Sequence, residues 1–363
     1  MELSRHPRVE WKKLFARPGF PYFFAGLFVS LCGSGMNFAG TSWYVLGRTN
    51  STLQVSVLLI LWTIPGLIVP FAGGVIIDRI DRRYLAMGLD LARGVIVLGT
   101  AAMIYFRNAG LTAVYFMVVC LGIGSAMYWS AVNALVQEII PTGELVAANS
   151  AVLIAVQGGL AISGAFVGFV YDHAGIAGIL AIDGSSYFLS SLCLFGLRRG
   201  HFPPHIYRNE DLPAGLEAPL AAAEETALAP LIEPSIETGF VAELREGFRY
   251  LQSRPAVLAM GLTYACMIAG VVSGNVVVVA LVKDILNAHA FGYGMMESGW
   301  AIGAIAGGLA AGALARRFTV PAVLLAVMWV LSVGHAIFPY VSSLAAGVSR
   351  WACLAAAAQL AES

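Results

Sequence analysis

Charge is what this sequence has least of: only 12% of its 363 residues are Asp, Glu, Lys or Arg, against roughly 25% in an average soluble domain. Lys plus Arg and Asp plus Glu number 21 each, so no basic excess points to nucleic acid as a partner. With 59% apolar residues and 40 glycines, the chain has more apolar side chain than a water-soluble fold of this size could bury. An ordinary soluble protein is therefore excluded.

Cysteine and catalytic motifs are scarce too. The five cysteines are an odd number, lie far apart and fall mostly in apolar runs, which gives neither a disulfide framework nor a metal site. No GxxxxGK[ST] string and no nucleophile motif with a base is present. We therefore expect no metal, no cofactor, no ATP-driven motor and no enzyme.

Long apolar runs are what the sequence has in abundance. A bilayer core about 30 Å thick needs about 20 apolar residues in a helix. The runs predict nine membrane-spanning helices, at 22–46, 55–77, 85–106, 111–136, 150–170, 176–197, 256–282, 293–314 and 319–340. A tenth run, 342–361, is a poorer candidate because Arg350 falls near its middle. We expect an all-α polytopic membrane protein with nine or ten transmembrane helices.

The basic residues predict how the helices are oriented. With the N-terminus in the cytoplasm, the inner segments hold 16 of the 21 Lys and Arg residues and the outer loops hold three. Basic residues accumulate in cytoplasmic segments, so we expect a multi-pass protein of the inner or plasma membrane with a cytoplasmic N-terminus. The inner loop at 137–148 is an exception, because it carries Glu138 and Glu144 and no base.

The region between the sixth and seventh spans interrupts the membrane pattern. Residues 203–237 hold six of the fifteen prolines and seven acids, which predicts a flexible polar linker at 201–238. Apolar residues then recur at helical spacing, which predicts an amphipathic helix at 239–253. The expected domains are a six-helix bundle at 1–200, this cytoplasmic linker, and a second bundle at 239–363.

An internal repeat relates the two bundles at an offset of 234. Residues 73–84 align with 307–318, and the start of the first span aligns with the start of the seventh. On this offset the sequence stops within the fourth helix of the second half, which predicts an incomplete C-terminal bundle whose apolar faces lack neighbours. The tail at 349–362, with one Trp and many alanines, has little bulk to pack.

The loop between the second and third spans carries a motif that resembles a known family. Its residues are Gly74, Asp78, Arg79, Asp81, Arg82 and Arg83. The pattern resembles the signature loop of the major facilitator superfamily, with Asp81 where the general pattern has Gly. Asp81, together with Asp90-Leu91-Ala92-Arg93, is similar to the macrolide-efflux and siderophore-exporter branch, as are 134–141, 147–149, Asp183 and 246–251.

The resemblance implies a major facilitator-like fold and secondary transport, in a chain shortened at its C-terminus. It implies that helices five and eight face each other, and that Asp78 contacts the start of an eleventh helix, which lies beyond this sequence. Independently of the resemblance, acids and bases in a tight turn can form a charge network that breaks when the two halves rock. The loop is therefore a candidate gate, or else a cytoplasmic anchor.

Ionisable residues inside spans are candidates for proton coupling. Asp90 and Arg93 lie three residues apart on one helix face and can neutralise each other as a structural pair. Asp183 has no basic neighbour within a helical turn and lies about 10 Å deep, so it either carries a proton or serves packing and hydrogen bonding. Glu297 lies about one turn inside the outer end of the eighth span, where it either couples protons or reaches water.

The resemblance also implies that helices one, four, seven and ten line a central cavity. The polar candidates on these helices are Asn37, Asn133, Gln137 and Asn275, and the aromatic ones are Trp43, Tyr128 and Trp129. Each Asn is equally interpretable as an interhelical hydrogen-bonding residue, and the aromatic residues as part of an interfacial belt.

These features favour a secondary transporter that exports amphipathic small molecules, of the drug or siderophore type, in exchange for protons. Its expected partners are a small-molecule substrate, the proton and the lipid bilayer. Two other interpretations stay open at this point: a truncated, inactive remnant of a transporter, and an integral membrane enzyme or receptor.

Overall fold

The fold is described from a computed structural model. It describes residues 11–17, 19–106, 110–141, 144–197, 249, 252–314 and 320–362. The side chains of 11, 67, 70–79, 146, 256, 257, 260, 264, 311–314, 320–325, 339, 361 and 362 lie outside this description. The chain divides into two compact units, one formed by 1–202 together with 270–363 and the other by 203–269. The predicted linker at 201–238 lies outside the described residues, as does most of the helix predicted at 239–253, so the predicted domain boundaries stay predictions.

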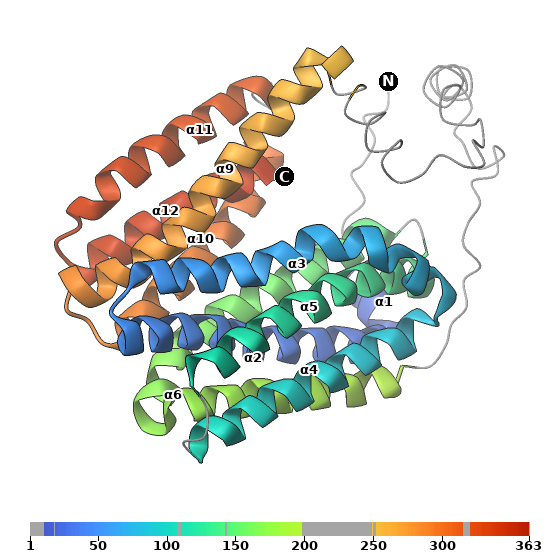
Figure 1. Cartoon of the computed structure of the whole chain (residues 1–363). Helices are drawn as coiled ribbons and strands as arrows, with labels where there is room; N and C mark the ends of the chain where they lie inside the picture. Colours follow the sequence, from blue (N-terminus) through green and yellow to red (C-terminus); the bar gives the residue numbers. More distant parts are fainter. Residues whose placement is uncertain are drawn as a thin grey trace, which may run out of the picture. The chain divides into compact units, whose positions relative to one another are not determined.

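Within the described residues every regular element is a helix (Figure 1). The elements are α1 (Trp11–Ala16), α2 (Phe20–Thr49), α3 (Thr52–Arg79), α4 (Arg82–Tyr105), α5 (Leu111–Ile139), α6 (Leu145–Phe195), α9 (Pro255–Ala280), the π-helix η3 (Leu281–Ile285), α10 (Ala290–Leu314), α11 (Val320–Ile337), the 3-10 helix η4 (Phe338–Tyr340) and α12 (Leu344–Glu362). The all-α prediction is confirmed. We call the end of the bundle where α2 begins the predicted cytoplasmic end, and the end where α2 stops the predicted outer end.

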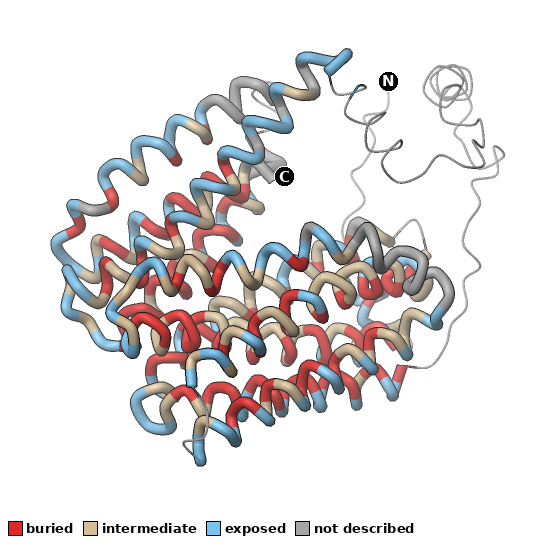
Figure 2. Tube along the Cα trace, viewed as in Figure 1, coloured by how far each residue is buried: buried red, intermediate tan, exposed pale blue. Residues whose placement is uncertain are grey.

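Length and composition make several of these helices able to cross a bilayer. In the described part of the chain, five helices are long and apolar enough. One of them, α6, consists of two arms that meet at Gly175, whose φ of 62° is a left-handed conformation that favours glycine. Its arms agree with the separate spans predicted at 150–170 and 176–197. Exposed residues recur along the helices (Figure 2). Many of the exposed side chains are large and apolar, among them Tyr105 and Phe195.

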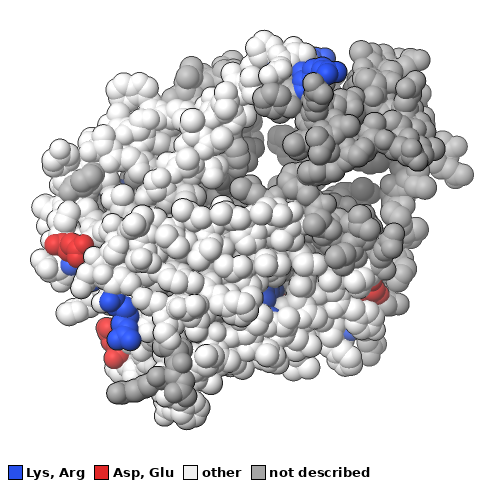
Figure 3. Space-filling model, viewed as in Figure 1, with Lys and Arg blue, Asp and Glu red and all other residues white. Residues whose placement is uncertain are grey.

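The first six spans form one bundle around α6. Its two arms contact α2 and α4, while α5 packs between α3 and α4. At the predicted cytoplasmic end, Phe20, Phe23 and Leu27 of α2 belong to a buried core with Leu135 of α5 and Ala148 of α6. Figure 3 shows that the face it displays carries few charged side chains among the described residues.

The second half repeats the helix order of the first. The offset of 234 carries Leu111, where α5 begins, to residue 345, and α12 begins at Leu344. The same offset carries Arg79, the last residue of α3, to residue 313, and α10 ends at Leu314. The repeat predicted from the sequence therefore relates the helices themselves.

The expectation that the tail packs poorly is wrong. Helix α12 runs along α10, where a Cβ on Gly303 or Gly307 would overlap the carbonyls of Ala352 and Ala356. The alanines thus allow a close backbone approach, which is how membrane helices gain contact area without bulky side chains. Trp351 is fully buried, 4.7 Å from the ring of Trp300.

Arg350 does not stop this helix because its charge stays out of the core. The side chain is exposed, and its guanidinium donates to the carbonyl of Ile337 at 3.4 Å. A long side chain near a helix end can hold its charged head away from apolar neighbours in this way.

The acidic inner loop is explained by partners from other segments. Glu144, just before α6, receives two hydrogen bonds from Arg17, Nε to Oε2 at 2.6 Å and Nη2 to Oε1 at 2.7 Å. Glu138, near the end of α5, forms an ion pair with Arg82 at the start of α4. Both exceptions to the positive-inside pattern are therefore neutralised at the predicted cytoplasmic end, by bases far away in sequence.

We expect Gly303→Leu to destabilise the chain, because its side chain would overlap the backbone of α12. Overpacking typically costs about 1–3 kcal/mol, so the midpoint of thermal unfolding in detergent should fall by several degrees. Gly270→Leu on α9 is the matched control, since a Cβ there meets open space. Equal shifts in the two variants would contradict close α10–α12 packing.

We expect the Arg17–Glu144 pair to stabilise the chain in a pH-dependent way. The hydrogen bond from Arg17 lowers the pKa of Glu144 below its ordinary 4.5, while slight burial opposes the shift and the charges of Arg17 and Lys13 assist it. The folded chain thus binds protons less readily at Glu144 than the unfolded chain does. The contribution is full above about pH 4.5 and is lost as the pH falls through the lowered pKa.

Glu144→Gln should therefore reduce the free energy of unfolding at pH 7 by at most about 1 kcal/mol, as for other solvent-accessible pairs. Denaturant titrations in detergent at pH 7 and pH 3 measure this difference, which should be smaller at the lower pH. Combining Glu144→Gln with Arg17→Gln should cost less than the sum of the single changes, and additive costs would mean that the two residues do not interact.

Candidate functional site

The loop between α3 and α4 is joined to the first half of the chain. Asp81 caps α4, since its Oδ1 accepts from the backbone N–H groups of Arg83 at 3.1 Å and Tyr84 at 3.4 Å. Arg83 donates to the carbonyls of Leu194 at 2.8 Å and Phe195, at the end of α6. With the Arg82–Glu138 pair, these bonds connect the loop to α5 and α6.

The other three loop residues singled out from the sequence are Gly74, Asp78 and Arg79. They fall in the last turns of α3, whose side chains lie outside the described residues. The role of Asp78 as a gating residue stays a prediction.

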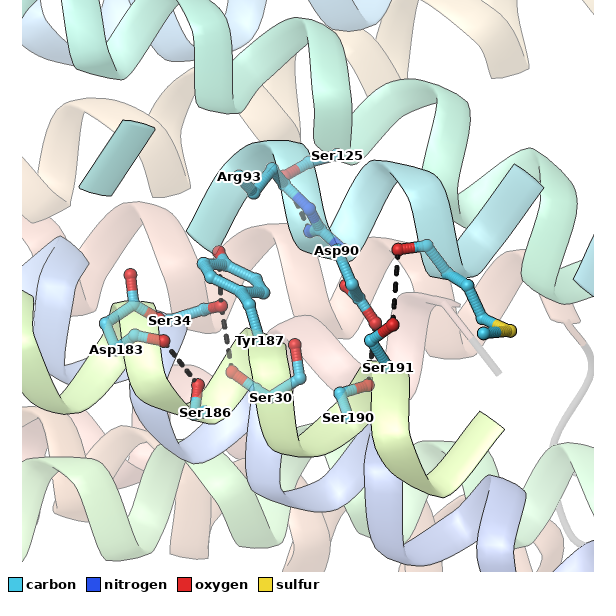
Figure 4. A network of polar contacts seen from close by, with 11 residues as sticks. Ser30, Ser34, Asp90, Arg93, Ser125, Asp183, Ser186, Tyr187, Ser190 and Ser191 are labelled. Atoms are coloured by element: carbon cyan, nitrogen blue, oxygen red, sulfur yellow. Dashed lines mark hydrogen bonds and ion pairs between the residues drawn. The ribbon is translucent and has the colours of Figure 1, made fainter. Parts of the chain in front are cut away.

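Asp90 and Arg93 form a buried ion pair on α4, as their spacing predicts (Figure 4). Asp90 is fully buried and Arg93 is 4% exposed. The second carboxylate oxygen of Asp90 accepts from the Ser190 hydroxyl of α6 at 2.7 Å. A buried charge needs both a counter-charge and hydrogen bonds, and this acid has both.

Two tyrosines enclose the guanidinium of Arg93. Its Cζ lies 4.2 Å from the ring centroid of Tyr128 on α5 and 4.5 Å from that of Tyr187 on α6. Aromatic faces attract cations, more strongly when water is excluded. The Tyr187 hydroxyl also shares a hydrogen bond with Ser34 of α2 at 2.9 Å, so four helices meet around one cation.

Asp183 lies in the same interior and is fully buried. Its Oδ2 accepts from Asn37 Nδ2 at 2.6 Å, and Thr41 donates to the other side of that amide at 2.8 Å. Its Oδ1 has no hydrogen-bond partner in the described part of the chain. The basic neighbour that its own helix lacks is supplied by Arg93 of α4, which interacts with it electrostatically.

We call Asp90, Arg93 and Asp183 the buried charge cluster. It holds two acids and one base in an interior from which water is excluded. If both acids are ionised, one negative charge remains uncompensated, and such a charge is costly away from water. A proton on either acid would remove this excess charge. In the described residues no group of three or more His, Cys, Asp or Glu side chains could hold a metal ion.

The predicted cavity residues are found in different settings. Asn133 and Gln137 are exposed and lie one turn apart on α5. Asn275 is half-buried and donates to the carbonyl of Val271 on its own helix at 3.3 Å. Asn37 is buried and donates a hydrogen bond to Asp183. Tyr128 is 3% exposed against Arg93, with the ring of Trp129 at its edge, so this tyrosine lies inside the first bundle.

Glu297 of α10 is buried and not accessible to water. It is 4% exposed, so the interpretation that it reaches water is wrong in this structure. Trp43 of α2, a half-buried cavity candidate, stacks on Tyr293, one turn before Glu297, with centroids 6.0 Å apart.

The first arm of α6 and α10 face each other, as the resemblance implied. A Cβ on Gly164 or Gly168 would overlap the backbone of α10, and Ser298 donates to the carbonyl of Ala161 at 2.9 Å. Sequence reasoning missed a further contact between the halves, from Gln157 Nε2 to Gln359 Oε1 at 3.0 Å. Both residues are amides within apolar runs, and this pattern in the sequence indicates a hydrogen bond between helices.

Comparisons with known proteins place this geometry in a family. The family model described as Major Facilitator Superfamily matches residues 4–362. Among solved structures, the chain is similar to a bacterial homolog of the human lysosomal transporter Spinster in an inward-facing and unoccupied conformation. Their identity is 15% and the TM-score 0.59, over 94% of this chain and 73% of that one.

It is also similar to an auto-inhibited peptide transporter of the POT family, with 11% identity and a TM-score of 0.50, over 94% of this chain and 80% of that one. No curated protein matches the sequence. At these identities the solved structures show the fold alone, whereas the family model covers nearly the whole chain. The chain belongs to the major facilitator superfamily of membrane-embedded secondary transporters.

Proposed function

We propose that this transporter exports amphipathic small molecules, of the drug or siderophore type, in exchange for protons that enter across the inner or plasma membrane. The observation that carries the proposal is the buried charge cluster, which contains two acids but only one base. A proton is the smallest species that can neutralise this excess in a closed interior. The resemblance of the loop to exporter sequences supports the direction of transport and the substrate type.

In this proposal Asp183 carries the proton. Asn37 holds one carboxylate oxygen while the other has no partner in the described part of the chain, so the proton would reside on Oδ1. Arg93 remains charged because Asp90 and two aromatic rings hold it. Binding and release of the proton thus change the charge between α2, α4 and α6 without removing the central cation.

The substrate is proposed to bind in a cavity between the halves. The exposed Asn133 and Gln137 offer hydrogen bonds there, and Trp129, Trp43 and Asn275 complete the set predicted from the sequence. The orientation with a cytoplasmic N-terminus places the loop at 78–83 on the side from which substrate enters. It is supported by the accumulation of basic residues in the inner segments.

Proteoliposomes with an imposed pH gradient test the proposal. We expect a fluorescent amphipathic probe to move against the direction of proton flow, and to stop when a protonophore collapses the gradient. Movement in the same direction as protons would indicate uptake, and movement that ignores the gradient would exclude proton coupling. No movement under any gradient would favour the inactive alternative.

Asp183→Asn should abolish the coupling of transport to an imposed proton gradient and preserve substrate binding. The amide is of similar size and can still accept from Asn37, but it cannot take up a proton. Transport is measured from pH 5.5 to 8.5, and probe binding by fluorescence at each pH. Asp172→Asn, at an exposed acid on the same helix, is the matched control and should behave like the unaltered chain. Normal proton coupling in Asp183→Asn would make this acid structural.

Asp78→Asn should lower transport and leave membrane abundance nearly unchanged, because the flanking spans are apolar enough to insert unaided. Asp78→Glu keeps the charge and should retain more transport. Initial rates are compared after normalisation to the protein present in the membrane. If abundance and transport fall together, the loop is a folding anchor.

A further inference from the structure

The two halves of the chain meet closely near the predicted outer end. Here α10 packs against α2 and the first arm of α6. A Cβ on Gly164 or Gly168 would overlap the backbone around Gly294 and Phe291. We call this contact, between residues 290–298 of α10 and the facing parts of α2 and α6, the seam. Its glycines leave no room for water between the helix backbones.

Glu297 lies inside the seam. The residue is 4% exposed, and its carboxylate oxygen Oε1 has no hydrogen-bond partner in the described part of the chain. Tyr293, one turn earlier, is 1% exposed and is covered by the stacked ring of Trp43 from the other half. When the halves are together, Glu297 is therefore closed off from both water and counter-charge.

The charged groups nearby are directed elsewhere. Lys283 of η3 donates to the Leu46 carbonyl at 3.0 Å and to Asn50 Oδ1 at 2.6 Å, which caps the end of α2. Arg350 of α12 contacts the Ile337 carbonyl. The other titratable or charged side chains near this level on α2, α6 and η3 are Tyr44, Arg48, Tyr171, Asp172, His173 and Asp284. Among the described residues, the titratable group that faces Glu297 is Tyr293 on its own helix.

The seam thus treats the two forms of Glu297 differently. A carboxylate without a counter-charge is strongly disfavoured in a dry contact between helices, whereas a neutral carboxyl is tolerated. When the halves separate at this end, water reaches the side chain and the penalty on the ionised form disappears. Closing of the seam and protonation of Glu297 therefore favour each other, since a ligand shifts a two-state equilibrium toward the state that binds it better.

We propose that Glu297 is a second proton-binding site, distinct from Asp183, and that the seam closes only over its protonated form. The proton comes from water at the predicted outer end while the seam is open, and it returns to water when the carboxyl ionises and the seam opens. This inference rests on the alternating movement of the halves in the proposed function, but not on the role of Asp183.

Distances between spin labels across the seam test the inference. Labels at Arg48 of α2 and Asp284 of η3, both exposed and on opposite halves, are attached to the full chain in lipid nanodiscs after the five native cysteines are replaced by alanine. His173 and His289, the exposed imidazoles near this end, are replaced by Gln in every labelled protein. Distance distributions are recorded from pH 5 to 8.5.

We expect a short distance at low pH and a growing long-distance population as the pH rises. Glu297→Gln should keep the short distance at all pH values, and Glu297→Asp should restore a pH-dependent shift. Asp183→Asn should leave the shift intact, which separates this site from the proposed carrier. The inference is overturned if the unaltered seam does not respond to pH, or if Glu297→Gln responds as the unaltered chain does.

Either overturning result leaves the Asp183 experiment unaffected. Conversely, a pH-insensitive transport rate in vesicles with a normal, Glu297-dependent seam response would remove the proposed function and retain this site. Should Glu297→Gln fold poorly, the Glu297→Met variant, which is also neutral but apolar, carries the same expectation of a permanently short distance.

Discussion

A single cation without access to water organises the first half of the chain. The guanidinium of Arg93 is almost completely buried, and leaving it unpaired would be costly. It contacts an acid from its own helix, the rings of Tyr128 and Tyr187, and the hydroxyl of Ser125 at 3.5 Å. Its Nε has no hydrogen-bond partner in the described part of the chain. Since these groups come from α4, α5 and α6, their helices are fixed in register by the needs of one side chain. Helix α2 is joined to α6 by two hydrogen bonds, one between Ser34 and Tyr187 and one from Asn37 to Asp183.

The contact between the halves follows a different rule. Here the interacting groups are mostly backbone atoms, which approach because Gly164, Gly168 and Gly294 lack side chains. Such contacts have little specific chemistry and can separate and re-form without breaking strong bonds. Among the described residues, the side-chain hydrogen bonds between the halves include those of Lys283 with the end of α2, Gln157 with Gln359 and Ser298 with Ala161. The contact between the halves therefore differs in kind from the ionic and aromatic contacts inside the first half.

Much of the fold could be predicted from the sequence, because apolar length and periodicity reflect the bilayer directly. The predicted spans correspond to helices, the break between the fifth and sixth spans lies close to Gly175, and the repeat offset of 234 relates the helix ends of the two halves. The prediction that α12 packs poorly is wrong because it considered only the size of the side chains. Ala352 and Ala356 instead let the backbone of α12 lie close to that of α10. Hydrophobicity alone does not distinguish a small residue that packs tightly from one that packs poorly.

The candidate site was less predictable, because its contacts join residues far apart in sequence. The Asp90–Arg93 pair is local and was found from its spacing. The packing of α4 against α6 decides that Arg93 lies near Asp183 and that the ring of Tyr187 covers the guanidinium of Arg93. Likewise, nothing near Glu297 in the sequence indicated that it would be buried. Local patterns thus identified the ionisable residues, and only the packing of helices showed which of them share an interior.

The bond between Arg17 and Glu144 also has a consequence for synthesis. Leu14 of α1 is buried and Arg17 is bonded to a residue that follows it by 127 positions. The short N-terminal segment therefore emerges from the ribosome long before its partner exists. Its bond to Glu144 can therefore form only after the four spans between them have been synthesised, so the N-terminal segment takes its final position late, whereas its own residues are made first.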